Sequence, residues 1–310
     1  MSETPKVTII MATYNRTHFI LESLVSIQNQ TFKKWECLII DDGGTDNTLE
    51  ALQPILKLDN RFQFLKRTGS YKKGLPGCRN YGLDLAKGEY IIYFDDDDFV
   101  HPDNLKTCIE AIETYNVDFC HYQKLGYLSQ EPPIESKPIS IQQYLTKADI
   151  EKVVTQQIGM ASCTVMWKKH CFENCRFNEN LLYAEEWECY SRLISENFKG
   201  IIINNILYFN RKHANSNTGE FYKNDIVRIN SKKEAIRLVA YNIASKNLLT
   251  PSLLKYLAGL AIGFRDTRLL NDIIAKAGIK TNKKLFLHLK YWLFPIWKVY
   301  KITGKKLNYK

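Results

Sequence analysis

The chain lacks several patterns that would assign it to a common class of protein. Its eight cysteines include no Cys-x-x-Cys pair and lack the partners of a complete zinc set, so a structural zinc is not expected. No Gly-x-Gly-x-x-Gly follows the first strand-like run, which disfavours a dinucleotide-dependent oxidoreductase. No apolar run reaches the roughly 20 residues that span a bilayer. No Ser-His-Asp or Cys-His arrangement indicates a covalent nucleophile.

What the chain does contain is typical of a folded protein. Its 310 residues are 45% hydrophobic and 25% charged, which does not fit intrinsic disorder. The first six residues lead into a strand-like run without a signal peptide, and the scattered cysteines fit reduced core thiols. We therefore expect a cytoplasmic protein. Much of the net charge of +10 comes from lysines after residue 222, which indicates an acidic partner such as nucleic acid or an anionic membrane.

The pattern of apolar residues predicts an α/β protein. In the first hundred residues, short apolar runs alternate with amphipathic stretches, as in a parallel sheet with crossover helices. The predicted strands are 7–11, 37–40, 62–66, 89–94, 118–127 and 200–209. The predicted helices are 17–28, 48–58, 79–87 (closed by Gly88), 103–115, 183–194 and, weakly, 141–154. Everything beyond residue 224 reads as helical, with a domain boundary near residue 218.

The run Asp95-Asp96-Asp97-Asp98 is the most informative segment, because it directly follows the predicted strand 89–94. Ligands of open α/β sheets bind at the carboxyl ends of strands. Four adjacent carboxylates repel one another, and hard divalent ions bridge carboxylates to substrate phosphates. The run therefore predicts a metal–phosphate site that holds Mn²⁺ or Mg²⁺, although an acidic tetrad taken alone is more often a solvated loop.

A second acidic segment, Asp41 to Asp46, follows the strand 37–40. Its glycines allow the backbone to approach a ligand closely. Asp46 is expected to be the N-cap of the next helix. Asp42 is a candidate acceptor for a hydrogen bond from a base or a ribose.

Five short segments follow one another in a recognisable order. They are Val7 to Arg16, Gln30-Thr31-Phe32, Ile40 to Asp46, Gly77 to Gly82, and Phe94 to Asp98 followed by Pro102 and Leu105. Together they resemble the motifs of family 2 glycosyltransferases, of the kind that build bacterial surface polysaccharides. The resemblance implies a GT-A fold, a Rossmann-like mixed sheet with flanking helices. Residues 1–218 would form the catalytic domain (1–105 for the nucleotide-sugar, 106–218 for the acceptor), followed by a basic helical extension over 219–310.

The resemblance also implies roles for residues at the donor site. Asp42 would contact the base, typically uracil, and Asp97 would hold the metal that bridges the diphosphate. Asp95 or Asp96 would lie near the ribose, and Arg79 near the nucleotide or its phosphates. The loop that would cover the base is Ala12-Thr13-Tyr14.

The acceptor side is implied by two further segments. Ala184 to Leu193 resembles the Glu-Asp segment of the family, with Glu186 where the family's general base is usually Asp; Glu185 next to it is the other candidate. Trp187 is expected in the core or as an acceptor platform. Phe209 to Asn217 resembles an Arg-x-His segment in which Arg211 would neutralise phosphate and His213 would ligate the metal or touch the diphosphate.

The C-terminal segment 285–297 carries Trp and Tyr beside Lys, a composition typical of segments that lie in the headgroup region. An ordinary helical subdomain is an equal alternative. Peripheral contact with the inner face of a membrane would suit an enzyme whose acceptor is carried on a lipid.

The sequence thus predicts a metal-dependent inverting glycosyltransferase that uses a nucleotide-sugar and a saccharide or lipid-linked acceptor. A nucleotidyltransferase also uses paired carboxylates and a metal, and it remains an alternative. A basic nucleic-acid-binding protein is the other alternative, but no helix-turn-helix, zinc-finger or RNA-binding signature accompanies the charge, so no nucleic-acid partner is expected. The sugar, the linkage and the oligomeric state are not predicted.

Overall fold

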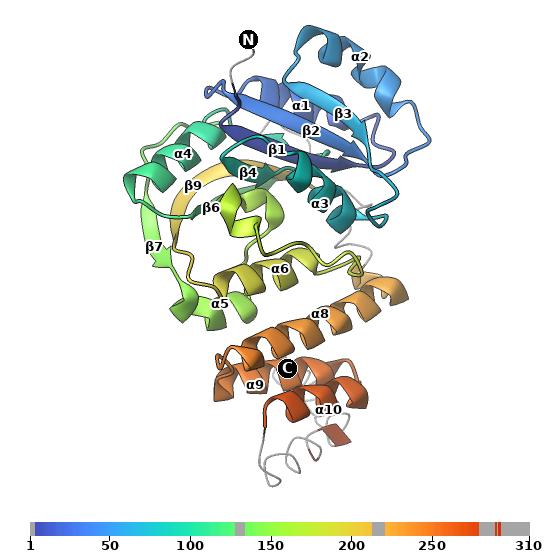
Figure 1. The fold of residues 1–310 in the computed structure, drawn as a ribbon, viewed down its shortest axis with the longest axis vertical. Coiled ribbons are helices and arrows are strands. Elements are labelled where there is room, and N and C mark those ends of the chain that lie inside the picture. Colours follow the sequence, from blue (N-terminus) through green and yellow to red (C-terminus); the bar gives the residue numbers. More distant parts are fainter. Residues whose placement is uncertain (1–3, 128–133, 213–220, 279–288, 290, 293–310) are drawn as a thin grey trace, which may run out of the picture. The chain divides into compact units, whose positions relative to one another are not determined.

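The computed structural model of the protein describes residues 4–127, 134–212, 221–278, 289 and 291–292 (Figure 1). The chain divides into two compact units, Met1–Ser231 and Lys232–Lys310. The division falls within helix α8 (Ile226–Ser245), later in the chain than the boundary expected near residue 218. The second unit also contains α9 (Pro251–Gly263) and α10 (Thr267–Lys276).

The first unit is built on one mixed sheet, whose strands follow the order β3-β2-β1-β4-β8-β6-β9-β5, with β7 paired to β9. Strands β3, β2, β1 and β4 are parallel, whereas β8 runs antiparallel to both β4 and β6. The strands are β1 (Val7–Thr13), β2 (Trp35–Asp41), β3 (Phe62–Lys66), β4 (Tyr90–Tyr93), β5 (Phe99–Val100), β6 (Phe119–Tyr127), β7 (Ile141–Leu145), β8 (Val165–Lys168) and β9 (Gly200–Arg211).

Helices cover both faces of the parallel part of the sheet (Figure 1). The first unit contains α1 (Ile20–Gln28), α2 (Thr48–Leu58), α3 (Leu75–Leu85), α4 (Asn104–Thr114), α5 (Ile150–Val154) and α6 (Glu185–Ile194). On one face, Ile9 and Ile39 lie in a large buried cluster with Leu24 of α1. On the other face, Leu38 and Ile40 pack with Cys78 of α3. Because the strands are buried on both faces, they are continuous apolar runs rather than alternating ones.

The α/β class with a mixed sheet is confirmed, and so are most of the expected elements. One expected helix was wrong, and strands β5 and β8 were not predicted. The weak helix over 141–154 is instead strand β7, a 3₁₀ turn (Lys147–Asp149) and the short α5. Strand β8, which joins the two halves of the sheet, was not predicted, because its four residues are too few to show a period.

Gly88 was expected to close the third helix, but α3 ends at Leu85. The structure shows another reason for a glycine there. A Cβ on Gly88 would lie 2.5 Å from the backbone nitrogen of Thr8, and the Gly88 N–H donates to Thr8 Oγ1 at 2.8 Å. The glycine therefore permits a close approach of two backbones beside the first strand.

All eight cysteines are buried and free, which confirms the expectation of core thiols. Among the residues that the structure describes, no helix is long and apolar enough to cross a bilayer.

Replacing Gly88 by alanine is expected to destabilise the protein by about 1–3 kcal/mol, because backbone atoms cannot move aside for the new methyl group. Urea denaturation followed by circular dichroism measures this loss. Gly159→Ala is the matched control, since a Cβ there meets no atom within 4 Å. An equal effect of the two substitutions would contradict the close-approach explanation.

Candidate active site

The acidic segments predicted to form the site lie at one edge of the sheet. Asp41 ends β2, and the Asp95–Asp98 run follows β4. Strand β1 pairs in parallel with both, so the carboxyl ends of the three strands share this edge. Thr13, the last residue of β1, stands opposite Asp41 in the register. The tertiary structure therefore brings together acidic residues that lie more than fifty positions apart in the sequence.

The Asp42 carboxylate is held in place by groups from two other segments. Arg67, which directly follows β3, donates from Nε to Oδ1 of Asp42 at 2.6 Å. The Gly74 N–H donates to both carboxylate oxygens at 2.9 and 3.1 Å. Neither partner could be predicted from the sequence, because Arg67 and Gly74 belong to no motif; the only sequence signal was a cation at the carboxyl end of a strand. The contact of Asp42 with a base stays a prediction.

The predicted base-covering loop Ala12-Thr13-Tyr14 ends strand β1 and leads into the site. Thr13 is buried, whereas Tyr14 is 46% exposed. The ammonium of Lys73 lies 4.5 Å from the centre of the Tyr14 ring. An exposed ring beside this edge of the sheet fits the predicted covering role but does not test it.

The four aspartates of the tetrad have different surroundings. Asp96 and Asp97 are both near Arg16, whose Nε lies 3.6 Å from Asp96 Oδ1 and whose Nη2 lies 3.8 Å from Asp97 Oδ2. Asp98 accepts hydrogen bonds from the Asn210 side chain at 3.0 and 3.1 Å and from the Arg211 N–H at 2.8 Å. Asp98 thus joins the tetrad to the end of β9.

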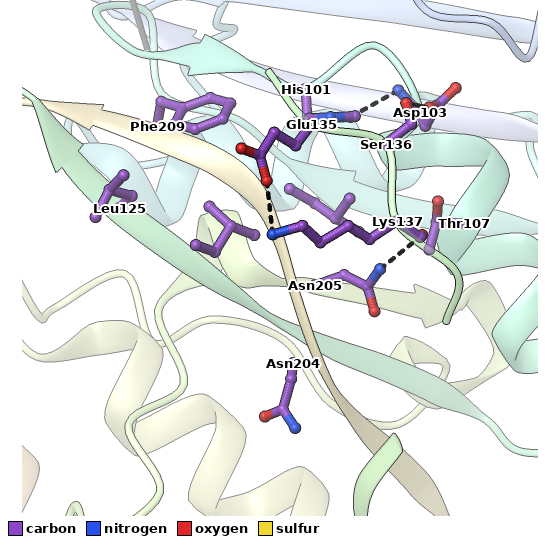
Figure 2. A pocket seen from close by; sticks show the side chains of 12 residues that line it. His101, Asp103, Thr107, Leu125, Glu135, Ser136, Lys137, Asn204, Asn205 and Phe209 are labelled. Atoms are coloured by element: carbon purple, nitrogen blue, oxygen red, sulfur yellow. Dashed lines mark hydrogen bonds and ion pairs between the residues drawn. The ribbon is translucent and has the colours of Figure 1, made fainter. Parts of the chain in front are cut away.

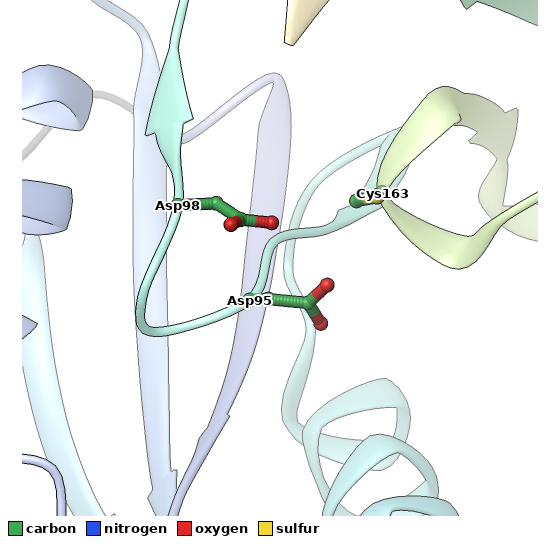
Figure 3. A group of neighbouring side chains, drawn as sticks. All are labelled: Asp95, Asp98 and Cys163. Carbon is green, nitrogen blue, oxygen red and sulfur yellow. The ribbon is translucent and has the colours of Figure 1, made fainter. Parts of the chain in front are cut away.

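The carboxylates of Asp95 and Asp98 converge with the thiol of Cys163, all within 4.8 Å of one another (Figure 3). Burial, with repulsion from the neighbouring carboxylates, raises the pKa of Asp95 and of Asp98. Two charges that the fold disfavours suit a divalent cation, because oxygen ligands are those that Mg²⁺ and Mn²⁺ prefer. The thiol does not suit such an ion, since burial raises the pKa of Cys163 well above its usual range.

Neither of the predicted metal ligands, Asp97 and His213, belongs to this cluster of described residues. Asp97 is the neighbour of the two converging carboxylates, and its carbonyl oxygen accepts from Arg211 Nε at 2.9 Å. Its role as a ligand stays a prediction. His213 lies outside the described residues. Arg211 also pairs with Glu22 of α1, and its contact with phosphate stays a prediction.

Arg79 has partners other than the nucleotide that the resemblance implies. Its guanidinium is buried and donates to Glu185 Oε1 at 2.9 Å and to Ser162 Oγ at 2.9 Å. These bonds connect α3, beside the donor edge of the sheet, to α6. The structure thus gives Arg79 a positioning role, and its contact with the nucleotide stays a prediction.

The same ion pair distinguishes the two candidate bases. Glu185 is buried and its carboxylate is engaged by Arg79, whereas Glu186 is only half-buried and accepts a hydrogen bond from the Ser162 N–H at 3.0 Å. Ala184, just before them, adopts a left-handed conformation with φ of 64°. The chain therefore turns at Ala184, directly before helix α6 begins at Glu185. Trp187 belongs to the core, where its Nε1 donates to the Val154 carbonyl at 3.1 Å.

Lys124 of β6 was not predicted, yet its charge lies among those of the site. Burial lowers the pKa of Lys124, but the nearby Cys163, Glu186, Asp95 and Asp98 outweigh burial, and the net pKa is raised. The cation therefore offsets part of the repulsion within the acidic cluster. No sequence signal identified it, because nothing marks one lysine of a strand as facing a distant carboxylate.

A separate pocket lies beside β9 and contains none of the predicted site residues (Figure 2). His101 and Asp103 line it, and the His101 Nδ1 accepts from the Asp103 N–H at 3.0 Å. Across the pocket, the Asn205 side chain donates to the carbonyl of Lys137 at 3.1 Å. These bonds attach segment 134–137 to β9, and we assign the pocket no chemistry.

Asp96 generates a testable dependence of stability on pH. Burial raises its pKa to about 7, so the folded protein holds a proton there that the unfolded chain releases near pH 4. Stability should fall as the pH rises from about 4 to 7. Relative to wild type, Asp96→Asn should gain up to about 1.4 kcal/mol of unfolding free energy per pH unit in this range and then level off.

Urea denaturation in a chelator, at pH 4 to 8, measures the difference. The control is Glu110→Gln, which removes an exposed carboxylate from α4. A difference between Asp96→Asn and wild type that is constant with pH would refute the expected shift.

Three comparisons with known proteins agree with this geometry. Residues 8–171 match the family model described as glycosyl transferase family 2. A GalNAc(5)-diNAcBac-PP-undecaprenol beta-1,3-glucosyltransferase of Campylobacter jejuni is 33% identical over 195 residues, which are 62% of this chain and 60% of that protein. An uncharacterized glycosyltransferase of Rickettsia felis is 31% identical over 197 residues, 63% of this chain and 31% of that protein. The chain thus spans less than two thirds of the length of these relatives.

Solved structures show the same fold. S. aureus TarS 1–349 in complex with UDP-GlcNAc has a TM-score of 0.64 at 21% identity, over 87% of this chain and 73% of that one. The mannosyltransferase PcManGT of Pyrobaculum calidifontis, in complex with GDP-Man and Mn²⁺, has a TM-score of 0.58 at 15% identity, over 98% of this chain and 84% of that one. With its α/β sheet of GT-A type and the matched motifs, the chain belongs to glycosyltransferase family 2.

Proposed function

We propose that the protein is an inverting glycosyltransferase that moves a sugar from a nucleotide-sugar, most simply a UDP-sugar, to an acceptor hydroxyl. The observation that carries the proposal is the placement of Glu186. Its carboxylate accepts a hydrogen bond from the N–H of Ser162, and the next residue, Cys163, lies within 4.8 Å of the Asp95 and Asp98 carboxylates. Glu186 and Asp95 nevertheless come from different elements, α6 and the end of β4. A base and a leaving-group site from separate elements suit displacement at a carbon between them.

In this mechanism Glu186 removes the proton from the acceptor hydroxyl as the oxygen attacks the anomeric carbon. The bond from that carbon to the nucleoside diphosphate breaks, and the configuration inverts. The Ser162 N–H orients the Glu186 carboxylate, and the Arg79–Glu185 pair fixes the helix that carries it. General-base help of this kind contributes roughly a hundred- to ten-thousand-fold.

The residues that would hold Mn²⁺ or Mg²⁺ are Asp95 and Asp98, with Asp97 as the ligand implied by the family. When bound, such an ion would stabilise the negative charge that develops on the departing diphosphate. The Mn²⁺ in the PcManGT complex supports this assignment. Lys124 and Arg16 supply further positive charge to the same edge of the sheet.

The acceptor class is proposed from the named relatives. The C. jejuni protein is named for a glycan on undecaprenyl diphosphate, which supports a lipid-linked saccharide as the acceptor here. Peripheral membrane contact through residues 219–310 stays a proposal, since most of segment 285–297 lies outside the described residues. Family membership now outweighs the nucleotidyltransferase and nucleic-acid-binding alternatives.

The function is tested by incubating the protein with a panel of UDP-, GDP- and dTDP-sugars and Mn²⁺ and measuring release of the nucleoside diphosphate. We expect turnover of one donor, suppressed by a chelator. No turnover or binding of any donor would refute the proposal.

Glu186→Gln is expected to lower transfer by roughly a hundred- to ten-thousand-fold while donor binding is kept, because the amide cannot accept the proton. Glu185→Gln is the matched control: it should instead lower stability by about 3–5 kcal/mol, since it leaves the Arg79 cation unpaired. Single-turnover kinetics and urea denaturation separate the two effects. Loss of activity at Glu185 with full stability would reverse the assignment of the base.

Asp95→Asn and Asp98→Asn are expected to raise the Mn²⁺ concentration needed for half-maximal turnover by at least about tenfold, because each removes a carboxylate ligand. Asp97→Asn is compared in the same titration. A tenfold shift for Asp97→Asn alone would place the metal on Asp97 and remove it from the Asp95–Asp98 pair.

A further inference from the structure

Three aromatic residues lie together beside the proposed base. Tyr183 and Phe221 are stacked, with ring centroids 4.4 Å apart and an angle of 8° between the ring planes. Tyr222 meets Phe221 edge-on, at 5.6 Å and 71°, and is 76% exposed. Two segments that are distant in sequence thus form one aromatic surface, and the mechanism above uses none of these rings.

We propose that Tyr183, Phe221 and Tyr222 form an aromatic platform that binds a sugar ring of the acceptor. This inference rests on the proposed glycosyltransferase function and adds where the acceptor lies.

The backbone beneath the platform is held firmly. The Ser231 hydroxyl accepts hydrogen bonds from the N–H groups of Leu182 and Tyr183, both at 2.9 Å, and donates to the Tyr183 carbonyl at 2.8 Å. Ala184 follows in the left-handed conformation, which costs about 1–2 kcal/mol in a residue with a Cβ. Such strain persists only where surrounding structure maintains it, and it commonly marks functional sites.

The residues on either side of Tyr183 in the sequence lead to the two parts of the proposed mechanism. On one side, the Leu182 side chain is in contact with Gly74, since a Cβ on Gly74 would lie 3.0 Å from Leu182 Cδ2. The Gly74 N–H in turn holds the Asp42 carboxylate of the donor site. On the other side, Tyr183 is only three residues before Glu186, whose charge helps to raise the pKa of Tyr183 after the larger effect of burial.

The chemistry of the surface suits a sugar. The C–H face of a pyranose packs against an aromatic face, while its hydroxyls need polar partners or water. The exposed residues Lys223 and Asn224 follow Tyr222 directly and offer such partners. Trp187, the aromatic residue that sequence analysis considered for this task, is in the core.

Methyl glycosides of glucose, galactose, N-acetylglucosamine and N-acetylgalactosamine are suitable probes, because they carry no lipid and no aromatic group. Their binding to the full chain with UDP and Mn²⁺ is measured by saturation-transfer NMR titration. Wild type should bind at least one glycoside. Tyr222→Ala should weaken that binding roughly tenfold, whereas Tyr222→Phe, which keeps the ring, should change it by less than about twofold.

The matched control is Tyr144→Ala, which removes a tyrosine that is 54% exposed on β7, away from the three rings in sequence. Its glycoside binding should equal that of wild type. Because Tyr222 is mostly exposed, its truncation does not open the core. Circular dichroism of each variant checks the fold.

Four results would overturn the platform. In the first two, wild type binds no glycoside, or Tyr222→Ala binds a glycoside as tightly as wild type does. In the other two, Tyr222→Ala loses affinity for UDP as much as for the glycoside, which would make the rings a site for the nucleotide base, or loses binding to anionic lipid vesicles but not to glycosides. Donor turnover by wild type is measured separately. If a donor is turned over but Tyr222→Ala does not weaken glycoside binding, only the platform is refuted. If glycoside binding depends on Tyr222 but no donor is turned over, the proposed transferase function is refuted.

Discussion

The buried ion pair between Arg79 and Glu185 is the contact on which the site depends. It joins α3, which packs on the parallel sheet, to α6, which carries the proposed base, across more than a hundred residues of sequence. Ser162 completes the arrangement, because its hydroxyl accepts from Arg79 while its N–H donates to Glu186. A buried pair is costly to desolvate and costlier to break, so it serves specificity of geometry better than net stability.

On the other side of the site, the carboxylates that follow β4 lie close together and repel one another. Burial raises the pKa of Asp95, Asp96 and Asp98, which shows that the fold disfavours their charged forms, and nearby positive groups offset only part of this cost. Arg16 comes from the loop after β1 and Lys124 from β6. Cations from separate segments thus surround one acidic loop. Such an arrangement can bind a metal and a diphosphate, as the proposed transfer requires.

The two sides of the site differ in how much of each could be predicted from the sequence. The acidic strand ends lie in short contiguous motifs, so Asp42 and the tetrad could be singled out from the residues alone as candidates for the donor site. The proposed acceptor side is made of single residues from separate segments. Ser162, Lys124 and the pair of Tyr183 with Phe221 carry no local pattern, and only the packing of β6, α6 and the start of the helical region brings them together.

The sequence by itself determined the α/β class, the order of the first strands and helices, the buried free cysteines and the acidic strand ends, because each of these is a local pattern of apolar period, turn residues or charge. The tertiary structure decided the rest. In the structure, β8 lies between β4 and β6, and Gly88 permits a close contact of two backbones rather than ending a helix. Glu185 and Glu186 have different hydrogen-bond partners. Two adjacent residues of the same type, such as these glutamates, differ only in the groups that contact them, and those groups come from distant parts of the chain.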